Sequence, residues 1–366
     1  MRIGPGVLLA ACCLAASAGC GGSSVVRIPL STTAAISPDG SEVAWLTRRC
    51  TIRSRDLSTG RVRNLGRLTT CPGYYPDGFQ LVVSAGVASV RESGGGNDWT
   101  DTVMGYRDAL HRPRTLFDSS YTIGGEIDGD VFGTDASSPD GVMWSWWHGS
   151  FRDERGTCED DGRGCLQRVD GGGVATWSGG SVKRIAGAPP AAAVATSGDL
   201  VGVAALPRGS WTSSPLFGVP VEIVVLRRSS GRRVAAFPLP RDAKYEFDNL
   251  LAVSSDLAGL VYTDDGYGVR LVFVDWHDGR VVRRVDLGKD TFPYEVTAVS
   301  LSMSGTTALV QSAGSATLVS GRTGRTYVLG RGHWVSGAQL VGGRALWVEN
   351  HWREHTAFLR SRSLPS

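Results

Sequence analysis

The stretch from residue 36 to residue 47 reads Ile-Ser-Pro-Asp-Gly-Ser-Glu-Val-Ala-Trp-Leu-Thr, and it decides the fold class. An apolar strand leads into Pro-Asp-Gly, where Pro presets the first corner of a turn, Asp bonds its own backbone and Gly accepts a positive φ. A second strand follows, and then a third strand, 53–56, leads into the turn Thr59-Gly60-Arg61. Strand, turn, strand, strand, turn, strand is the order of a four-stranded propeller blade.

Both turns recur along the chain. Pro-Asp-Gly returns at 76–78 and 139–141, with weaker copies at 253–257 and 301–305. The Gly-Arg turn returns at Gly231, Gly279 and Gly324, a spacing of about 45 residues that is typical of blades. Short strand-like runs surround these turns, at 221–226, 269–275, 281–287, 306–311 and 345–349, and no segment has sustained helical periodicity.

The repeat predicts an all-β chain folded as a propeller of seven blades. We expect the blades at about 34–66, 72–118, 120–187, 190–240, 248–288, 296–330 and 334–363. Six or eight blades remain alternatives, because the second and third are irregular. The last blade lacks a clear fourth strand, and the run Val25–Leu30 is a candidate to supply it and close the ring.

The segment 36–65 resembles the WD40-like repeats of TolB-type β-propellers. The elements that carry the resemblance are Ile36 to Gly40, Val43 to Leu46, and Asp56-Leu-Ser-Thr-Gly60. About four other blades match in part, and no TolB-like N-terminal domain adjoins them. The resemblance implies a ring-shaped binding platform, and it implies neither a particular partner nor a reaction.

The first 24 residues have the features of a bacterial lipoprotein leader. An apolar run from Ile3 to Ala18 follows Arg2, and Ser17-Ala-Gly-Cys20 then leads into Gly-Gly-Ser-Ser. Ser17 departs from the Leu that the lipobox prefers, and Cys12 is an alternative with a very short apolar core before it. We expect a signal peptide at 1–19, a lipidated Cys20 with a tether to 24, and the propeller at 25–366, lipid-anchored outside the cell membrane. Plain secretion remains a further alternative.

The four other cysteines after the leader suit an oxidising compartment. Proximity in sequence favours Cys50–Cys71 and Cys158–Cys165 among three possible pairings, and free buried thiols are the alternative. Blade topology places the Pro-Asp-Gly and Gly-Arg turns on one rim. The other rim receives the longer connections, at 93–101, 149–164, 207–219, 264–268 and 350–355, and the cysteines map to it. We therefore expect binding at this long-loop rim.

Charge and motifs exclude several function classes. The net charge is +3 and no long basic run occurs, so we expect no nucleic-acid partner. No P-loop, dinucleotide fingerprint or Gly-x-Ser-x-Gly elbow is present, and we expect no cofactor. His351-Trp-Arg-Glu-His355 has the letters of an inverted zinc-protease motif but lies between two strand-like runs, so we expect a polar loop, with incidental metal capture as an alternative. Glu159-Asp-Asp-Gly162 and the acidic residues at 126, 128 and 130 lack the spaced ligands of a calcium loop.

Aromatic residues divide into two groups. Trp144, Trp146 and Trp147 alternate along one strand, and we expect them to fill space between blades. The candidate binding residues lie in the long connections: Trp99, Trp211, Tyr267, His351, Trp352 and His355. We expect a non-catalytic platform that binds a protein or a cell-envelope glycan. The alternatives are a glycan lyase or hydrolase with its site over the central channel, and a purely structural surface protein. A converging cluster of ionisable side chains at the channel would favour the enzyme.

Overall fold

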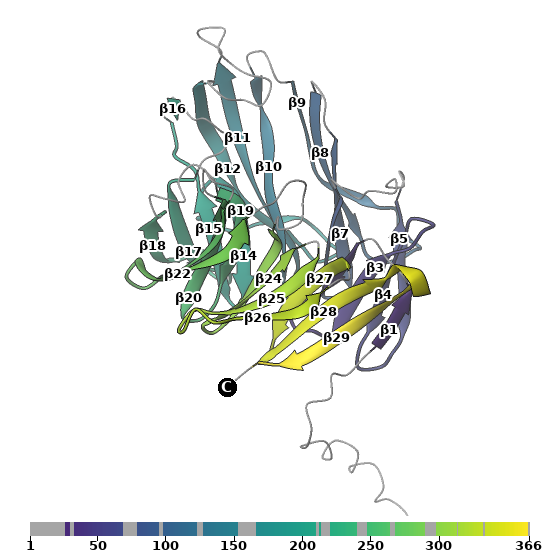
Figure 1. Ribbon diagram of the computed structural model, residues 1–366. Coiled ribbons are helices and arrows are strands. Elements are labelled where there is room, and N and C mark those ends of the chain that lie inside the picture. Colours follow the sequence, from purple (N-terminus) through teal and green to yellow (C-terminus); the bar gives the residue numbers. More distant parts are fainter. Residues whose placement is uncertain are drawn as a thin grey trace, which may run out of the picture.

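Seven four-stranded antiparallel sheets form a closed ring in a computed structural model of the chain (Figure 1). The structure describes residues 26–29, 33–68, 79–94, 98–122, 127–152, 166–209, 212–213, 220–239, 247–263, 268–289, 298–312, 314–331 and 334–364. Within these ranges the regular structure is strand, apart from one 3-10 turn, η2 (Trp352–Glu354). No helix in the described ranges is long and apolar enough to cross a membrane. The predicted propeller of seven blades is confirmed.

The blades follow the chain in order. Blades one to three are β2 (Ala34–Ile36), β3 (Glu42–Leu46), β4 (Thr51–Asp56) and β5 (Val62–Arg67); β6 (Phe79–Ser84), β7 (Val87–Gly94), β8 (Asp98–Tyr106) and β9 (Arg114–Thr122); and β10 (Ile127–Ser138), β11 (Gly141–Arg152), β12 (Leu166–Trp177) and β13 (Lys183–Arg184). Blades four to six are β14 (Ala191–Ser197), β15 (Leu200–Ala205), β17 (Glu222–Arg227) and β18 (Arg233–Pro238); β19 (Phe247–Val253), β20 (Leu257–Thr263), β21 (Gly268–Asp275) and β22 (Arg280–Lys289); and β23 (Ala298–Ser304), β24 (Thr307–Ser312), β25 (Ser315–Ser320) and β26 (Thr326–Arg331). The short β16 (Thr212–Ser213) pairs with β12.

The two ends of the chain close the ring together. Blade seven contains β27 (Trp334–Val341), β28 (Arg344–His351) and β29 (Thr356–Ser363), and its outer strand is β1 (Val26–Pro29). β1 runs antiparallel to β29, with Val26 opposite Leu359 and Pro29 opposite Thr356. Ile28 is 2% exposed and packs with Val348 and Leu359. The predicted closing strand at 25–30 is thus confirmed.

The Gly-Arg turns have one common geometry. Gly60, Gly231, Gly279 and Gly324 have φ between 69° and 75°, a region that favours glycine. Each donates its backbone N–H to the carbonyl four residues earlier, at 2.7 to 2.8 Å. All four turns join the third strand of a blade to the fourth, as predicted. They share one rim with the first-to-second turns, and we call it the tight-turn rim.

One predicted turn is wrong. Pro76-Asp77-Gly78 was expected to join the first two strands of blade two, but β6 begins after it, at Phe79. That hairpin turns instead at Ala85 and Gly86, which have φ of 49° and 77°. Two consecutive positive φ values are typical of the two-residue hairpin, so Ala85-Gly86 is the turn. Residues 76–78 lie outside the described residues.

Serine side chains link neighbouring blades at the tight-turn rim. The Ser84 hydroxyl donates to the Ser138 carbonyl of blade three, and the Ser254 hydroxyl donates to the Gly305 carbonyl of blade six at 2.6 Å. In blade one, the Ser37 hydroxyl instead donates to Asp39 at 2.6 Å, inside the Pro-Asp-Gly turn. The hydrogen bonds from Ser84 and Ser254 satisfy backbone carbonyls where the first strands end.

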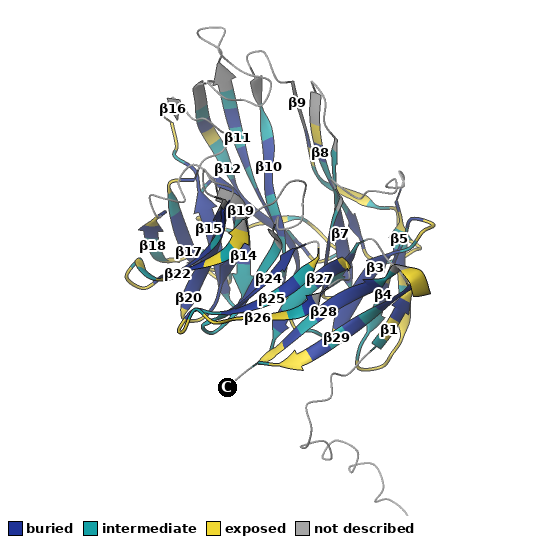
Figure 2. Ribbon diagram, in the orientation of Figure 1, coloured by how far each residue is buried: buried dark blue, intermediate teal, exposed yellow. Residues whose placement is uncertain are grey.

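The hydrophobic core lies between adjacent blades, as Figure 2 shows by the buried middle portions of the strands. The tryptophans of β11 fill two such layers. Trp144 is 2% exposed and packs with Val82 and Val103 of blade two, and Trp146 packs beside it. Trp147 lies on the opposite face and packs with Ala192 of blade four. Their predicted role between blades is confirmed.

Blades two and three project beyond the ring on the side away from the tight turns (Figure 1). β10, β11 and β12 have 12 residues each, and β8 and β9 have 9, whereas the strands of blade one have 3 to 6. The connections expected at 93–101 and 149–164 are therefore partly strand. We call this part of blades two and three the projecting hairpins, and we keep the name long-loop rim for the side on which they stand.

Candidate functional site

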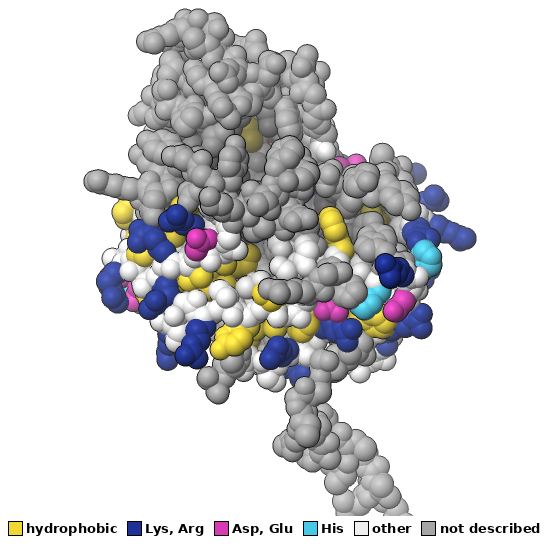
Figure 3. Space-filling model, in the orientation of Figure 1, with side chains coloured by type: hydrophobic (Ala, Val, Ile, Leu, Met, Phe, Trp, Pro, Cys, Tyr) yellow, Lys and Arg dark blue, Asp and Glu magenta, His cyan; other side chains and the backbone are white. Residues whose placement is uncertain are grey.

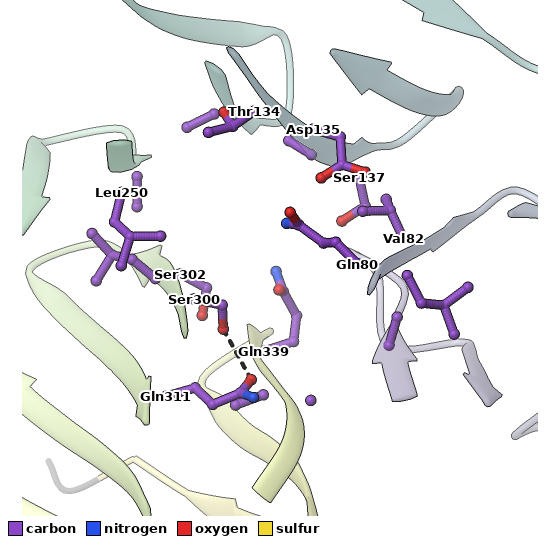
Figure 4. Close-up of a pocket in the computed structure, with 18 of the residues that line it drawn as sticks. Gln80, Val82, Thr134, Asp135, Ser137, Leu250, Ser300, Ser302, Gln311 and Gln339 are labelled. Carbon is purple, nitrogen blue, oxygen red and sulfur yellow. Dashed lines mark hydrogen bonds between the residues drawn. The ribbon is translucent and has the colours of Figure 1, made fainter. Parts of the chain in front are cut away.

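A cavity of about 500 Å³ occupies the centre of the ring. The first strand of every blade lines it, from β2 in blade one to β27 in blade seven. Its polar lining is mostly neutral amides and hydroxyls: Gln80, Thr134, Ser137, Ser300, Ser302 and Gln339 (Figure 4). Such a lining offers hydrogen-bond donors and acceptors without a strong field of either sign.

Part of this lining is held by hydrogen bonds within the wall. The Gln311 side chain accepts from the Ser300 hydroxyl at 3.0 Å and donates to the Val335 carbonyl at 3.1 Å. The Ser302 hydroxyl accepts from the Leu340 backbone N–H at 3.1 Å. Gln80 and Gln339 instead extend toward the centre of the cavity in Figure 4. The channel wall thus combines fixed polar groups with two amides that reach inward.

Asp135 is the carboxylate of the described lining. It lies on β10 just after a shift in register against β11, and it is 7% exposed. Neither of its side-chain oxygens has a hydrogen-bond partner among the described residues. Burial therefore raises the pKa of Asp135 to about 7, although the nearby Arg91 guanidinium and the residue's own backbone amide oppose the rise.

Arg91 does not neutralise Asp135, because its guanidinium is bound elsewhere. Arg91 donates through Nε and Nη2 to Oδ1 of the buried Asp101, at 3.0 and 2.8 Å. The Ser93 hydroxyl donates to the same oxygen at 2.8 Å, and Arg91 also lies over the Phe132 ring at 4.5 Å from its centre. Arg91 and Asp101 therefore form a pair, and the charge on Asp135 is left uncompensated.

The ionisable residues of the described lining are Arg91 and Asp135. Glycoside hydrolysis with two carboxyl groups needs them at about 5 to 9.5 Å from one another across the substrate. The described lining supplies one carboxyl group. The described lining is therefore a polar wall with one carboxyl group, that of Asp135, whose pKa burial raises toward neutral pH.

The predicted rim residues are spread over several blades. Trp99 is on β8, with Tyr121 as its partner on β9. His351 ends β28, Trp352 begins η2, and His355 follows η2 in a left-handed conformation with φ of 51°. Trp211 and Tyr267 lie outside the described residues, as do Cys71, Cys158 and Cys165.

The two histidines of the zinc-like motif have different partners. The ring of His351 lies 3.7 Å from Glu349 Oε2 and 3.8 Å from Glu354 Oε1, and it contacts Phe358 edge-on. His355 Nδ1 lies 3.1 Å from the Arg48 guanidinium of blade one. Among the described residues no group of three His, Cys, Asp or Glu is arranged to hold a metal ion. The motif forms a hairpin end, and His355 links blades seven and one.

Cys50 occupies the predicted place between the second and third strands of blade one. It is 3% exposed, packs with Leu46 and Ile52, and is disulfide-bonded. Its backbone N–H donates to Thr47 and its carbonyl accepts from Leu68, at 2.8 Å each. The pairing with Cys71 stays a prediction, because the second cysteine lies outside the described residues.

The projecting hairpins carry a polar surface that the sequence reading missed. His148 Nδ1 lies 3.0 Å from Asp130 Oδ1 between β11 and β10. On the neighbouring pair of strands, Asp170 accepts from Arg168 at 2.8 Å and from Ser150 at 3.2 Å. We call these five residues the hairpin polar cluster. The signal that could have found it is the run 148–152, where polar residues alternate with Gly149 and Phe151, a pattern typical of a strand.

The cysteine-rich leader and its Cys20 lie outside the described residues. No family model matches the chain, and no curated protein sequence matches it, so the resemblance to TolB-type repeats stays a prediction.

Solved structures that resemble the chain include Sqt1 from Saccharomyces cerevisiae, with 9% identity, a TM-score of 0.45, and coverage of 94% of this chain and 98% of Sqt1. BamB from Moraxella catarrhalis is 13% identical, with a TM-score of 0.40 and coverage of 89% and 83%. The uncharacterized protein lmo1340 from Listeria monocytogenes EGD-e is 9% identical, with a TM-score of 0.39 and coverage of 88% and 90%. The strand pairing of the chain itself is the evidence for its seven-bladed propeller.

Proposed function

We propose that this chain is an extracytoplasmic propeller, anchored by lipid at Cys20, that binds a protein or a cell-envelope glycan through its long-loop rim. The observation that carries the proposal is the projection of blades two and three. The three long strands of blade three have 12 residues each, whereas the strands of blade one and of blades four to seven have 3 to 10. The parts of these strands that project beyond the ring present a surface on the long-loop rim.

The chemistry of the hairpin polar cluster supports a binding role. His148 and Asp130 are 39% and 45% exposed, and Arg168 and Asp170 are 38% and 35% exposed. Half-exposed charged pairs are typical of the polar rim of an interface, where they set specificity and association rate. The amides of the channel add neutral hydrogen-bonding groups behind this surface.

The binding role is tested by cross-linking in intact cells. The variant combines Arg168→Glu with His148→Ala on the projecting hairpins, and a matched control combines Arg107→Glu with His111→Ala, two exposed residues on the tight-turn rim. We expect the first variant to lose the cross-linked partner and the control to keep it. Equal capture by both variants, with unchanged thermal unfolding, would contradict the proposed surface.

The anchor is tested separately. A Cys20→Ala variant is expected to leave the membrane fraction and to change in gel mobility, because it cannot be acylated. A variant that stays membrane-bound with unaltered mobility would remove Cys20 from the proposal. The glycan-active alternative requires a second acid near Asp135, and it would be supported by turnover of envelope glycan that Asp135→Asn abolishes.

A further inference from the structure

A ring of basic residues marks the place where each outer strand leaves the tight-turn rim. In all seven blades, Lys or Arg lies in the turn just before the fourth strand or in the first half of that strand. The residues of this basic ring are Arg27, Arg61, Arg63, Arg112, Arg114, Lys183, Arg184, Arg232, Arg233, Arg280, Arg283, Arg284 and Arg325. No Asp or Glu occurs in the described stretches 26–29, 61–67, 112–117, 182–185, 231–238, 279–285 and 324–331, although the turns before two of them contain Asp108, which lies 2.7 Å from His111, and Asp278, which lies 3.7 Å from Arg280.

The basic ring is open to solvent. All of its members are exposed except Arg63, which is half-buried beside Glu42 at 2.6 Å. Arg61, Arg232 and Arg325 form no ion pair with a described residue. Figure 3 shows Lys and Arg side chains distributed around the lower part of the visible face. The ring therefore presents cationic groups around the circumference of one side of the molecule.

Acidic side chains do occur on this rim, but they are bound within the turns. Asp56 accepts from the Ser58 hydroxyl at 2.6 Å and from the backbone N–H groups of Thr59 and Ser58 at 2.9 Å, which together lower its pKa to about 2. Asp199 accepts from Ser229, and Asp275 accepts from His277, at 2.9 and 3.0 Å. Each of these carboxylates is held close to the backbone, whereas the members of the basic ring other than Arg63 are exposed.

Protection of sheet edges explains only part of this pattern. Charged residues on edge strands prevent edge-to-edge association, and any position along the strand would serve. From the middle of the described outer strands onward, however, the charges become few and mixed, with Asp118 and Asp286 beside Arg67 and Lys289. The concentration of positive charge at one end of the outer strands therefore calls for a second cause.

The chain enters the propeller through this same rim. Pro29 lies opposite Thr356, which follows η2 on the long-loop rim, so Val26 lies toward the tight-turn rim. Five residues separate Cys20 from Val26, and the six steps from Cys20 to Val26 span at most roughly 20 Å at about 3.6 Å per extended residue. A lipid on Cys20 would hold the basic ring close to the membrane surface.

We propose that the tight-turn rim docks on an anionic membrane surface through the basic ring, so that the long-loop rim points away from the membrane. The orientation rests on the lipid anchor of the proposed function, whereas the affinity of the rim for anionic lipid does not. Lys and Arg near an anionic leaflet attract it over a Debye length, about 8 Å at physiological salt. The projecting hairpins would then stand on the side that faces a partner.

Vesicle co-sedimentation tests the surface without the anchor. The chain from Gly21 onward retains every described residue, since these begin at Val26. We expect it to bind vesicles that contain one third phosphatidylglycerol, to bind pure phosphatidylcholine much more weakly, and to dissociate as salt is raised. The triple variant Arg61→Gln, Arg232→Gln, Arg325→Gln removes three cations from three blades, and we expect binding on the order of 100-fold weaker, at about 1 kcal/mol per residue.

The matched control is Arg49→Gln, Arg67→Gln, Arg353→Gln, which removes the same charge from exposed positions on the long-loop side. We expect this control to bind as the unaltered chain does. Equal weakening by both triple variants, or equal binding to the two kinds of vesicle, would overturn the docking surface. Failure of lipidation at Cys20 would be recognised by fractionation of the Cys20→Ala variant and would leave the vesicle result unaffected.

Discussion

Replacing Asp135 with Asn should abolish a pH dependence of stability that originates in the channel wall. Asp135 is 7% exposed, and neither carboxylate oxygen has a hydrogen-bond partner among the described residues. Burial raises its pKa from 3.8 to about 7. The folded protein therefore binds this proton more tightly than the unfolded chain does, and the protonated carboxyl group is the form that the fold favours.

The sign and size of the effect follow from that pKa. The stabilisation by the bound proton is fully present below pH 4 and is lost as the pH rises through about 7. Because one pKa unit corresponds to about 1.4 kcal/mol, the whole change is on the order of 4 kcal/mol, and water that enters the channel would reduce it. Most of this loss falls between pH 5 and pH 7.5.

The assay is denaturant unfolding at intervals from pH 5 to pH 8.5, with the unaltered chain, Asp135→Asn and Asp118→Asn compared. Asp118 is an exposed carboxylate on β9, so its variant controls for the loss of one negative charge. We expect the difference in free energy of unfolding between Asp135→Asn and the unaltered chain to change by a few kcal/mol in favour of the variant as pH rises. The pH profile of Asp118→Asn should run parallel to that of the unaltered chain. A parallel profile for Asp135→Asn as well would refute the assignment of a buried, uncompensated carboxyl group.

Three other substitutions test the packing and the closure of the ring. Arg91→Gln should destabilise the fold by about 3 kcal/mol in chemical denaturation, because it leaves the buried Asp101 without its cation, and a change below 1 kcal/mol would contradict the pair as described. Gly279→Ala should cost more than Gly198→Ala in melting temperature: both glycines have positive φ, but a Cβ at 279 would lie 2.7 Å from Phe237 and a Cβ at 198 would meet nothing within 4 Å. Equal losses would mean that Phe237 moves aside without cost. Ile28→Asp should destabilise by about 3 kcal/mol or more and promote association, since it removes β1 from the core of blade seven and exposes the edge of β29; light scattering that stays monomeric would show that the ring closes without β1.

The blade boundaries and the closing strand were predictable from the sequence because local turn chemistry determines them. Gly60 and its three counterparts need a positive φ, and that requirement is visible in the letters Gly-Arg after a small or polar residue. The closing strand was predictable because blade seven had three strands and an open sheet edge calls for a partner. These signals act within a few residues or follow from the count of strands.

The second Pro-Asp-Gly misled the prediction because the same letters suit a link between blades. Blade two uses Ala85-Gly86, and nothing local in 76–78 marks it as lying before the first strand. The length of β10 to β12 was also missed, because glycines at 171–173 interrupt the alternation that would have revealed it. Asp135 was not predictable as a buried acid, since Gly-Thr-Asp-Ala-Ser reads as an ordinary polar strand. Its burial depends on seven strands meeting around one channel.

The closure by β1 has a mechanical consequence. The strand that completes blade seven is also the first described strand after Cys20, and four residue pairs join it to β29. Any pull on a lipid tether would reach the molecule there, and it would load those four pairs in shear along the strand axis. A short ladder would thus bear the force first. The order of synthesis also affects this ladder. β1 is made first, but its partner β29 is among the last thirty or so residues, so the two strands can pair only when synthesis is nearly complete.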